Sequence, residues 1–258
     1  MLINREFIRE VGAVAWLRRT AARQFSKRVL RRDNRITLPT GLGMRLPGDS
    51  RISTEVFVTG CNVDWGSEAL FASLLDPSSA FLDIGANVGY YSLYMLPKVA
   101  EVHAFEPDAR AACSLLTNLA AYPNAYVYSF ALSNRVGRAG FVQEMHSETS
   151  HLAVGAGTHE VKLTTIDRFV TERQIFVSGI KIDVEGADLD VLHGAEQTLK
   201  TQHPLVLTEA KPDDELFNFT QYLNYGVFAF VRRSGGVPFD RTWPQFSRAH
   251  QNAFSGPD

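Results

Sequence analysis

The sequence is poor in the features that mark secreted, metal-binding or membrane-spanning proteins. Its two cysteines, Cys61 and Cys113, have no metal-ligand spacing and form no disulfide framework. No stretch approaches the roughly 20 apolar residues of a transmembrane helix. The early apolar run 11–17 is short, and no clear small-residue cleavage site follows it. We therefore expect no secretory signal and a cytoplasmic location.

Charge is unevenly distributed along the chain, although the formal net charge is only −2. Residues 1–35 contain ten Lys and Arg against three Asp and Glu, whereas the remaining residues contain 16 against 25. This acidic body argues against nucleic acid as the main partner, because nucleic-acid-binding domains usually carry a basic face. With 258 residues and 45% hydrophobic content, the chain can bury the core of one full domain and carry an appendage.

Residues 1–62 are expected to form a basic helix and a flap ahead of a main domain over residues 63–258. The spacing of apolar residues predicts a helix over residues 5–32, with arginines on much of the opposite side. The apolar set is Phe7, Ile8, Val11, Val14, Ala15, Ala22, Phe25, Val29 and Leu30. Such a helix can lie on an anionic membrane surface, or pack across the domain or against a second subunit. We favour packing, with the arginines in solvent.

Between residues 34 and 62, prolines, glycines and short β-type runs predict a small antiparallel flap or hairpin. The β-type runs are residues 35–38 and 55–59. Residues 65–75 then have helical apolar spacing and end at an Asp-Pro pair. This helix precedes the first strand of the main domain and is placed to cover a cofactor.

The stretch from Phe81 to Ser92 predicts the first strand–turn–helix unit of an α/β domain. A short apolar run, 81–84, is followed by Gly85 and Gly89 and then by residues of helical period. Glycine lets the backbone turn sharply and approach a ligand closely. The helix that follows would direct its free amide N–H groups at that ligand.

Strand and helix patterns alternate through the rest of the chain. This alternation predicts a doubly wound, mostly parallel sheet, with a turn at Gly235-Gly236 leading to an antiparallel strand. The predicted strands are 99–105, 125–132, 179–184, 204–208 and 227–233, with a helix at 108–121. Two further β-like runs, 138–145 and 160–163, flank a polar loop that holds His146, Ser147, Thr149, Ser150 and His151. A long loop inside a compact domain is more often functional than idle.

The glycine spacing distinguishes between cofactors. It reads G-x-x-x-G, not the G-x-G-x-x-G of dinucleotide folds, and Asp83 in front of it would repel a pyrophosphate. A cofactor with an ammonium and a sulfonium tolerates that carboxylate. Glu106 follows the second strand, about twenty positions on, where an acid suits ribose hydroxyls. Together these features indicate S-adenosylmethionine.

Four carboxylates are predicted at strand ends, namely Asp83, Glu106, Asp183 and Glu209. Ligands bind at the carboxyl ends of the strands in such sheets, so these side chains should converge on one site. This convergence is stronger evidence than any single motif.

Three segments together resemble the FkbM-type methyltransferases, which are class I S-adenosylmethionine-dependent enzymes. The resemblance covers roughly residues 65–232, and the K-I-D-V-E-G-A segment is its most specific part. The segments are Phe81-Leu82-Asp83-Ile84-Gly85-Ala86-Asn87-Val88-Gly89, Phe105-Glu106-Pro107, and Ile180 to Asp188 with Leu192-His193-Gly194-Ala195. The resemblance implies a Rossmann-like class I methyltransferase sheet and O-methylation of a sugar, polyketide or other natural product.

The resemblance also implies roles for individual residues. It places Asp83, Gly85, Ala86, Asn87 and Gly89 at the methionine and ribose end of the cofactor, Glu106 at the ribose hydroxyls, and Ala131, within 129–132, at the adenine. It places Asp183 below the transferring methyl group and Glu185 beside it on the acceptor side. Asp188 stands where the family more often has Glu, a change that we expect to be harmless.

The chemistry requires alignment of acceptor, methyl group and sulfur, and for a hydroxyl acceptor also a base or a metal. Candidates are Asp183, Glu185, Glu209 and His151. Asp183 and Glu209 would be the Mg²⁺ ligands if a metal site exists; otherwise one carboxylate with a pKa raised by burial acts alone. The sequence leaves this open.

Other functions remain to be weighed against a small-molecule or glycan O-methyltransferase. Methylation of a peptide or amine nitrogen is the nearest alternative. A nicotinamide-dependent oxidoreductase is more remote, because Asp83 and the glycine spacing oppose it. A non-catalytic scaffold would have had no reason to keep Asp83, Glu106 and Asp183.

Overall fold

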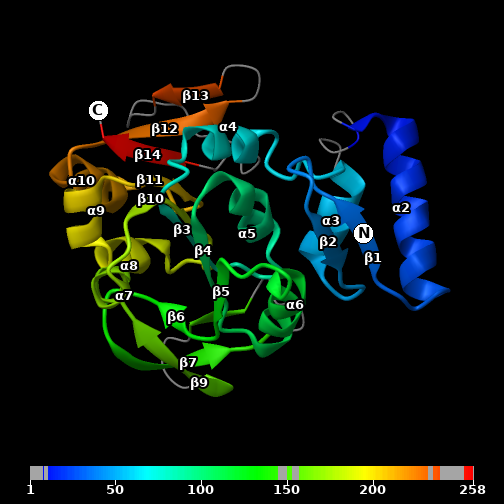
Figure 1. The fold of residues 1–258 in the computed structure, drawn as a ribbon, viewed down its shortest axis with the longest axis horizontal. Coiled ribbons are helices and arrows are strands. Elements are labelled where there is room, and N and C mark those ends of the chain that lie inside the picture. The colour runs from blue at the N-terminus through cyan, green and yellow to red at the C-terminus, as the bar shows by residue number, and fades with distance from the viewer. Residues whose placement is uncertain are drawn as a thin grey trace.

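An eight-stranded sheet with the order β13-β12-β14-β11-β10-β3-β4-β5 forms the centre of the molecule (Figure 1). The computed structural model describes residue 8 and residues 11–144, 150–152, 157–231, 235–238 and 253–257. The strands are β3 (Ala80–Ile84), β4 (Glu101–Phe105), β5 (Ala125–Tyr128), β10 (Val177–Ile182), β11 (Leu205–Thr208), β12 (Tyr225–Val231), β13 (Gly235–Pro238) and β14 (Ala253–Pro257).

Pairing within this sheet is parallel from β5 through β4, β3 and β10 to β11. β14 lies antiparallel between β11 and β12, and β13 extends the sheet as an antiparallel partner of β12. The predicted fold class, a mostly parallel Rossmann-like sheet with a C-terminal antiparallel strand, is confirmed.

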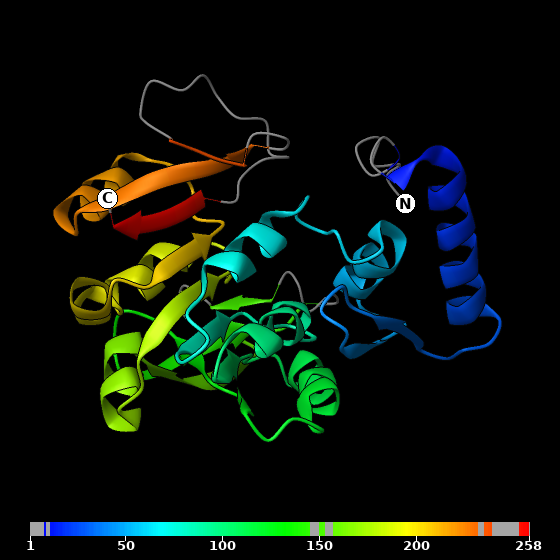
Figure 2. The same ribbon diagram turned by 45° about the horizontal axis from the view of Figure 1, so that its top comes forward.

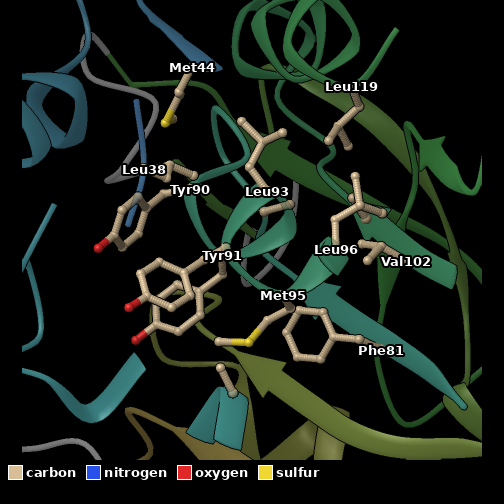
Figure 3. Close-up of a cluster of buried hydrophobic side chains, with 14 of the residues drawn as sticks. Leu38, Met44, Phe81, Tyr90, Tyr91, Leu93, Met95, Leu96, Val102 and Leu119 are labelled. Atoms are coloured by element: carbon tan, nitrogen blue, oxygen red, sulfur yellow. The ribbon is translucent and has the colours of Figure 1, made fainter. Parts of the chain in front are cut away.

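Helices cover both faces of the sheet, because its strands alternate buried side chains between two cores. Phe81 of β3 belongs to the first core, whereas Leu82 belongs to the second. Figure 3 shows Phe81 facing Met95 in the first core. The first core contains α4 (Ser67–Leu74), α5 (Tyr90–Met95), the short helix η1 (Leu96–Lys98) and α6 (Ala109–Leu119); the second contains α7 (Ile166–Arg173), α8 (Asp188–His193), α9 (Glu196–Gln202) and α10 (Asp214–Tyr222).

A second, four-stranded sheet lies beside the main one, in the order β6-β9-β7-β8. Its strands are β6 (Ala131–Leu132), β7 (Gly137–Val142), β8 (His151–Leu152) and β9 (His159–Thr164). The prediction of one continuous strand over 125–132 was wrong. Tyr128 pairs with Phe105, the last residue of β4, so the chain beyond Tyr128 has no partner in the main sheet and pairs with β9 instead.

The predicted hairpin is present as β1 (Asn34–Thr37) and β2 (Gly43–Leu46), which pair antiparallel. The predicted β-type run 55–59 was wrong, since these residues belong to helix α3 (Arg51–Thr59). Ser50 caps the helix by accepting the Ser53 N–H, and Gly60 ends it in a left-handed conformation. These two caps and the burial of Val56 override the strand preference of β-branched residues.

The predicted N-terminal helix is present as α2 (Ala13–Arg28), but the packing that we favoured was wrong about which side faces the domain. Arg23 and Ser26 are its buried residues, whereas Val14, Phe25 and Val29 are exposed. The surface beneath α2 offers oxygen acceptors from β1, β2 and α3, so it receives the polar side of the helix.

Candidate active site

One pocket of about 300 Å³ opens at the carboxyl ends of the parallel strands. Four carboxylates line it: Asp83 is the penultimate residue of β3, and Glu106, Asp183 and Glu209 directly follow β4, β10 and β11. The convergence predicted from the sequence is therefore confirmed. Every residue expected at the cofactor or acceptor lines this pocket except Gly89: Asp83, Gly85, Ala86, Asn87, Glu106, Ala131, His151, Asp183, Glu185 and Glu209.

The glycine turn brings the end of β3 against the end of β10. Gly85 has a φ of +75°, and a Cβ at this position would lie 1.9 Å from the Asp183 carbonyl oxygen. The Gly85 and Ala86 N–H groups both donate to the Phe105 carbonyl at 3.0 Å. Gly89 begins α5 with a φ of +90° and packs against Leu115, which explains its place behind the pocket wall. Only glycine fits the Gly85 position.

Glu106 fixes the glycine turn through hydrogen bonds to its carboxylate. Its Oε2 accepts the Asn87 N–H and its Oε1 accepts the Asp108 N–H, both at 2.8 Å. Burial raises the pKa of Glu106 to about 7 against the effect of these two hydrogen bonds. Each carboxylate oxygen retains a second lone pair for a ligand hydroxyl.

Two buried acceptors beside the turn have no hydrogen-bond partner within the described structure, Asp83 Oδ1 and Asn87 Oδ1. The other oxygen of Asp83 accepts the Ser92 hydroxyl at 2.5 Å. Burial raises the pKa of Asp83, although Lys181 opposes this shift. Because buried polar atoms in proteins are normally paired, these oxygens are suited to receive donors from a bound ligand.

Lys181 is a buried cation that the sequence analysis missed. Its Nζ lies 2.9 Å from Asp183 Oδ2, 4.0 Å from Asp83 Oδ1 and 3.3 Å from the Gly85 carbonyl. Although burial opposes its charge, Asp183 and Asp83 raise the pKa of Lys181. The available signal was its position two residues before Asp183 in an apolar strand, which places both side chains on one face.

Acidic side chains gather on the other side of the pocket. The Glu209 side chain is exposed to the pocket. The pKa of Glu209 is raised to about 8, mainly by desolvation from the pocket walls and then by the negative charges of Asp183 and Asp64. Glu185 is exposed with a φ of +47°, and partial burial with Asp183 and Asp188 raises its pKa. His151 reaches the same pocket from β8.

Asp188 and the polar loop are the remaining features that the sequence singled out. Asp188 is buried at the start of α8, and its Oδ1 accepts the Thr208 hydroxyl at 3.2 Å. Ser150 donates to Asp108 Oδ2 at 3.0 Å, which anchors the strand carrying His151. His146, Ser147 and Thr149 lie outside the described residues.

The pocket wall also includes residues between positions 51 and 64, which were not predicted to belong to the site. Arg51 and Glu55 come from α3, and Asp64 comes from the loop before α4. The Tyr91 hydroxyl donates to Asp64 Oδ2 at 2.5 Å. Glu68, almost fully buried, accepts the Tyr90 hydroxyl at 2.9 Å and the Val63 N–H at 3.0 Å, which fixes this loop against α5. Reading 55–59 as a strand concealed the contribution of α3.

A Mg²⁺ site at Asp183 and Glu209 gains no support. Within the described ranges, no three or more His, Cys, Asp or Glu side chains form a group that could hold a metal ion. The Lys181 ammonium already lies against Asp183.

None of the described helices combines the length and the apolar content needed to cross a bilayer.

The mostly parallel sheet and the pocket at its carboxyl edge define a Rossmann-like α/β protein with a ligand site at the strand ends. Residues 83–234 match the model of the methyltransferase FkbM domain, and the chain belongs to this family. It is 30% identical over 169 residues to the 2-O-methyltransferase NoeI of Sinorhizobium fredii, covering 56% of this chain and 68% of NoeI.

Solved structures with a similar fold include a methyltransferase FkbM from Methylobacillus flagellatus, at 14% identity and a TM-score of 0.49, covering 79% of this chain and 65% of that chain. A putative methyltransferase from Streptococcus mutans, in complex with SAH, is 11% identical with a TM-score of 0.45, covering 74% of this chain and 94% of that chain.

Proposed function

We propose that the protein uses S-adenosylmethionine to methylate a hydroxyl group of a sugar or another natural product. The observation that carries the proposal is the pair of buried acceptors beside the glycine turn, Asp83 Oδ1 and Asn87 Oδ1, which accept no hydrogen bond from the described residues. The cationic amino group of this cofactor supplies the donors that the two oxygens lack. A hydroxyl acceptor is supported by the similarity to a protein named as a 2-O-methyltransferase.

The remaining walls fit the other parts of the cofactor. Glu106 has free lone pairs for ribose hydroxyls while it holds the turn through Asn87. Phe130, Ala131 and Leu132 form an apolar wall for the adenine. Val63 and Asp64 close the pocket from the α4 side.

The cofactor supplies an electrophilic methyl group on a sulfonium centre. Lys181 orients Asp183 at 2.9 Å, so that Asp183 can accept a hydrogen bond from the acceptor. Glu209, with a pKa of about 8, takes the hydroxyl proton, since a general base works best with a pKa near the working pH. Glu185 and His151 contact the acceptor at the mouth of the pocket.

Calorimetric titration with S-adenosylhomocysteine, with and without Mg²⁺, tests the cofactor. We expect micromolar binding to the wild-type protein and about tenfold weaker binding to Asp83→Asn, because the amide presents less negative charge to the cationic group. Asp190→Asn, an exposed acid outside the pocket, is the matched control and should bind as the wild type does. Absence of binding in both conditions would remove the cofactor assignment. Binding that requires Mg²⁺ would restore the metal site.

Incubation with S-adenosylmethionine and panels of hydroxylated glycans, polyketides and amines tests the acceptor. A mass increase of one methyl group on a hydroxyl compound is expected, and Asp183→Asn should reduce turnover more than cofactor affinity. Equal losses in both would move Asp183 into the cofactor site. Methylation confined to amines would replace the O-methyltransferase proposal with N-methylation.

A further inference from the structure

The outer face of α2 is an apolar stripe that nothing in the described structure covers. We define this face as Val14, Leu17, Ala21, Phe25 and Val29, which recur at helical spacing along one side. Val14 is 73% exposed, Leu17 62%, Phe25 55% and Val29 63%. Figures 1 and 2 show α2 at the margin of the molecule, away from the main sheet.

Specific polar contacts hold α2 with this face outward. The Arg23 guanidinium donates to Asn34 Oδ1 at 2.8 Å, to the Leu46 carbonyl at 3.0 Å and to the Pro47 carbonyl. Arg19 donates to the Val58 carbonyl at 3.2 Å on the same side. The apolar exposure is therefore a consequence of how the helix is anchored.

The surroundings of the outer face are strongly basic. Asp33 is the only acid among residues 11–35, and it pairs with Arg45 at 2.7 Å. The exposed cations are Arg18, Lys27, Arg28, Arg31, Arg32 and Arg35, and the last three line a surface hollow with Arg45. Arg18 and Arg28 stand among these apolar residues on the same side of the helix, and exposed apolar side chains mixed with arginines can contact acyl chains and anionic lipid headgroups together.

The positive charge around this face also favours one binding partner over another. A two-fold dimer through the outer face would bring the same arginines of two copies together, and like charges across an interface oppose association. An anionic bilayer instead complements the arginines and receives the apolar stripe. We infer that the outer face of α2 docks the protein peripherally on an anionic lipid bilayer, a role independent of the proposed methyl transfer.

Co-sedimentation of the full chain with vesicles tests this inference. The vesicles contain phosphatidylcholine alone or phosphatidylcholine with about a third of phosphatidylglycerol. We expect at least about tenfold stronger partitioning to the anionic vesicles, weakened by salt because the headgroup attraction is screened. Equal binding to both vesicle types, or no binding to either, would overturn the inference.

Two pairs of variants separate the outer face from general surface hydrophobicity. Leu17→Ser with Phe25→Ser should abolish vesicle binding. Leu116→Ser with Phe176→Ser, at sites that are 55% and 54% exposed on other surfaces, should leave it unchanged. Equal losses in both pairs would overturn the inference.

Charge and self-association are tested separately. Arg18→Gln with Arg28→Gln should reduce binding to anionic vesicles several-fold while leaving the apolar stripe in place. Sedimentation velocity without vesicles measures the distribution between monomer and dimer. This distribution should be the same for the wild type and for Leu17→Ser with Phe25→Ser. A dimer that this pair dissociates would assign the face to a second copy instead of a bilayer. Circular dichroism confirms that each variant folds.

Discussion

Two buried cations, Arg23 and Lys181, hold very different surroundings in place. Arg23 lies under α2 and donates to neutral oxygens of Thr54, Asn34, Leu46 and Pro47. Burial lowers the pKa of its guanidinium, an effect that Asp33 and Asp49 oppose. Its contacts join the N-terminal helix to the hairpin and leave no opening toward a ligand.

Lys181 lines the pocket among carboxylates, and its neighbour Asp83 keeps one oxygen that accepts no hydrogen bond from the part of the chain that the structure describes. The comparison shows that burial of a charge alone does not identify a functional site. A charge saturated by neutral acceptors stabilises architecture, whereas a charge network with acceptors still open toward a cavity is prepared for a ligand.

Replacing Arg23 should give the largest effect and should fall entirely on stability. Arg23→Leu leaves several buried oxygens without donors, so we expect a loss of about 3–5 kcal/mol in the free energy of unfolding. Chemical denaturation measures it, with exposed Arg18→Leu as a control expected to stay within about 0.5 kcal/mol. Affinity of the folded variant for S-adenosylhomocysteine should not change. Weakened affinity would break the contrast between the two cations.

Replacing Lys181 should act on the pocket instead. Lys181→Met removes the positive charge between Asp83 and Asp183, so both carboxylates lose the cation that lies 4.0 Å and 2.9 Å from their oxygens. We expect about 10- to 30-fold weaker binding of S-adenosylhomocysteine, or roughly 1.4–2 kcal/mol, by calorimetry. Lys200→Met, at a half-buried, ion-paired lysine outside the pocket, serves as the control. Unchanged affinity would assign Lys181 to structure alone.

The pH dependence of stability should report on Glu106. Its pKa rises from 4.5 to about 7 on folding, so the folded state binds the extra proton in this window. The associated stability is fully present below pH 4.5 and is lost as the pH rises through 7, on the order of 3 kcal/mol. Thermal unfolding of Glu106→Gln should show a flatter profile, whereas exposed Glu160→Gln should keep the wild-type slope. A wild-type slope in Glu106→Gln would contradict the raised pKa.

The smallest effect is expected on the outer face of α2. Phe25→Ala should change the free energy of unfolding by no more than about 0.5 kcal/mol, because Phe25 is 55% exposed and Arg23 anchors the helix. A loss above about 1 kcal/mol would mean that the apolar stripe packs against the domain after all.

The sequence allowed most of the sheet, and the carboxylates gathered at its edge, to be predicted. Buried strands that end in a carboxylate and a glycine or proline are local signals, which is why Asp83, Glu106, Asp183 and Glu209 were placed together correctly. Local signals failed where distant partners decide the outcome. The acceptors of Arg23 come from residues 34, 46, 47 and 54, and no pattern within α2 shows that they will be there.

Helix α3 illustrates a second reason for failure. Val56, Val58 and Thr59 favour a strand by propensity, but capping by Ser50 and Gly60 and burial against the first core decide for a helix. The roles of the pocket residues remain predictions. A sequence shows which carboxylates meet, but their separate tasks depend on small differences in desolvation, such as those that separate Glu106 from Glu209.

The position of β14 has a consequence for how the protein is made. Residues 253–257 follow every other strand that the structure describes, yet β14 lies between β11 and β12 inside the sheet. During synthesis, the edges of β11 and β12 that pair with β14 therefore have unpaired backbone groups until residues 253–257 leave the ribosome. Open strand edges of this kind recruit other chains, so the interval before β14 inserts is when the nascent protein most needs protection from aggregation.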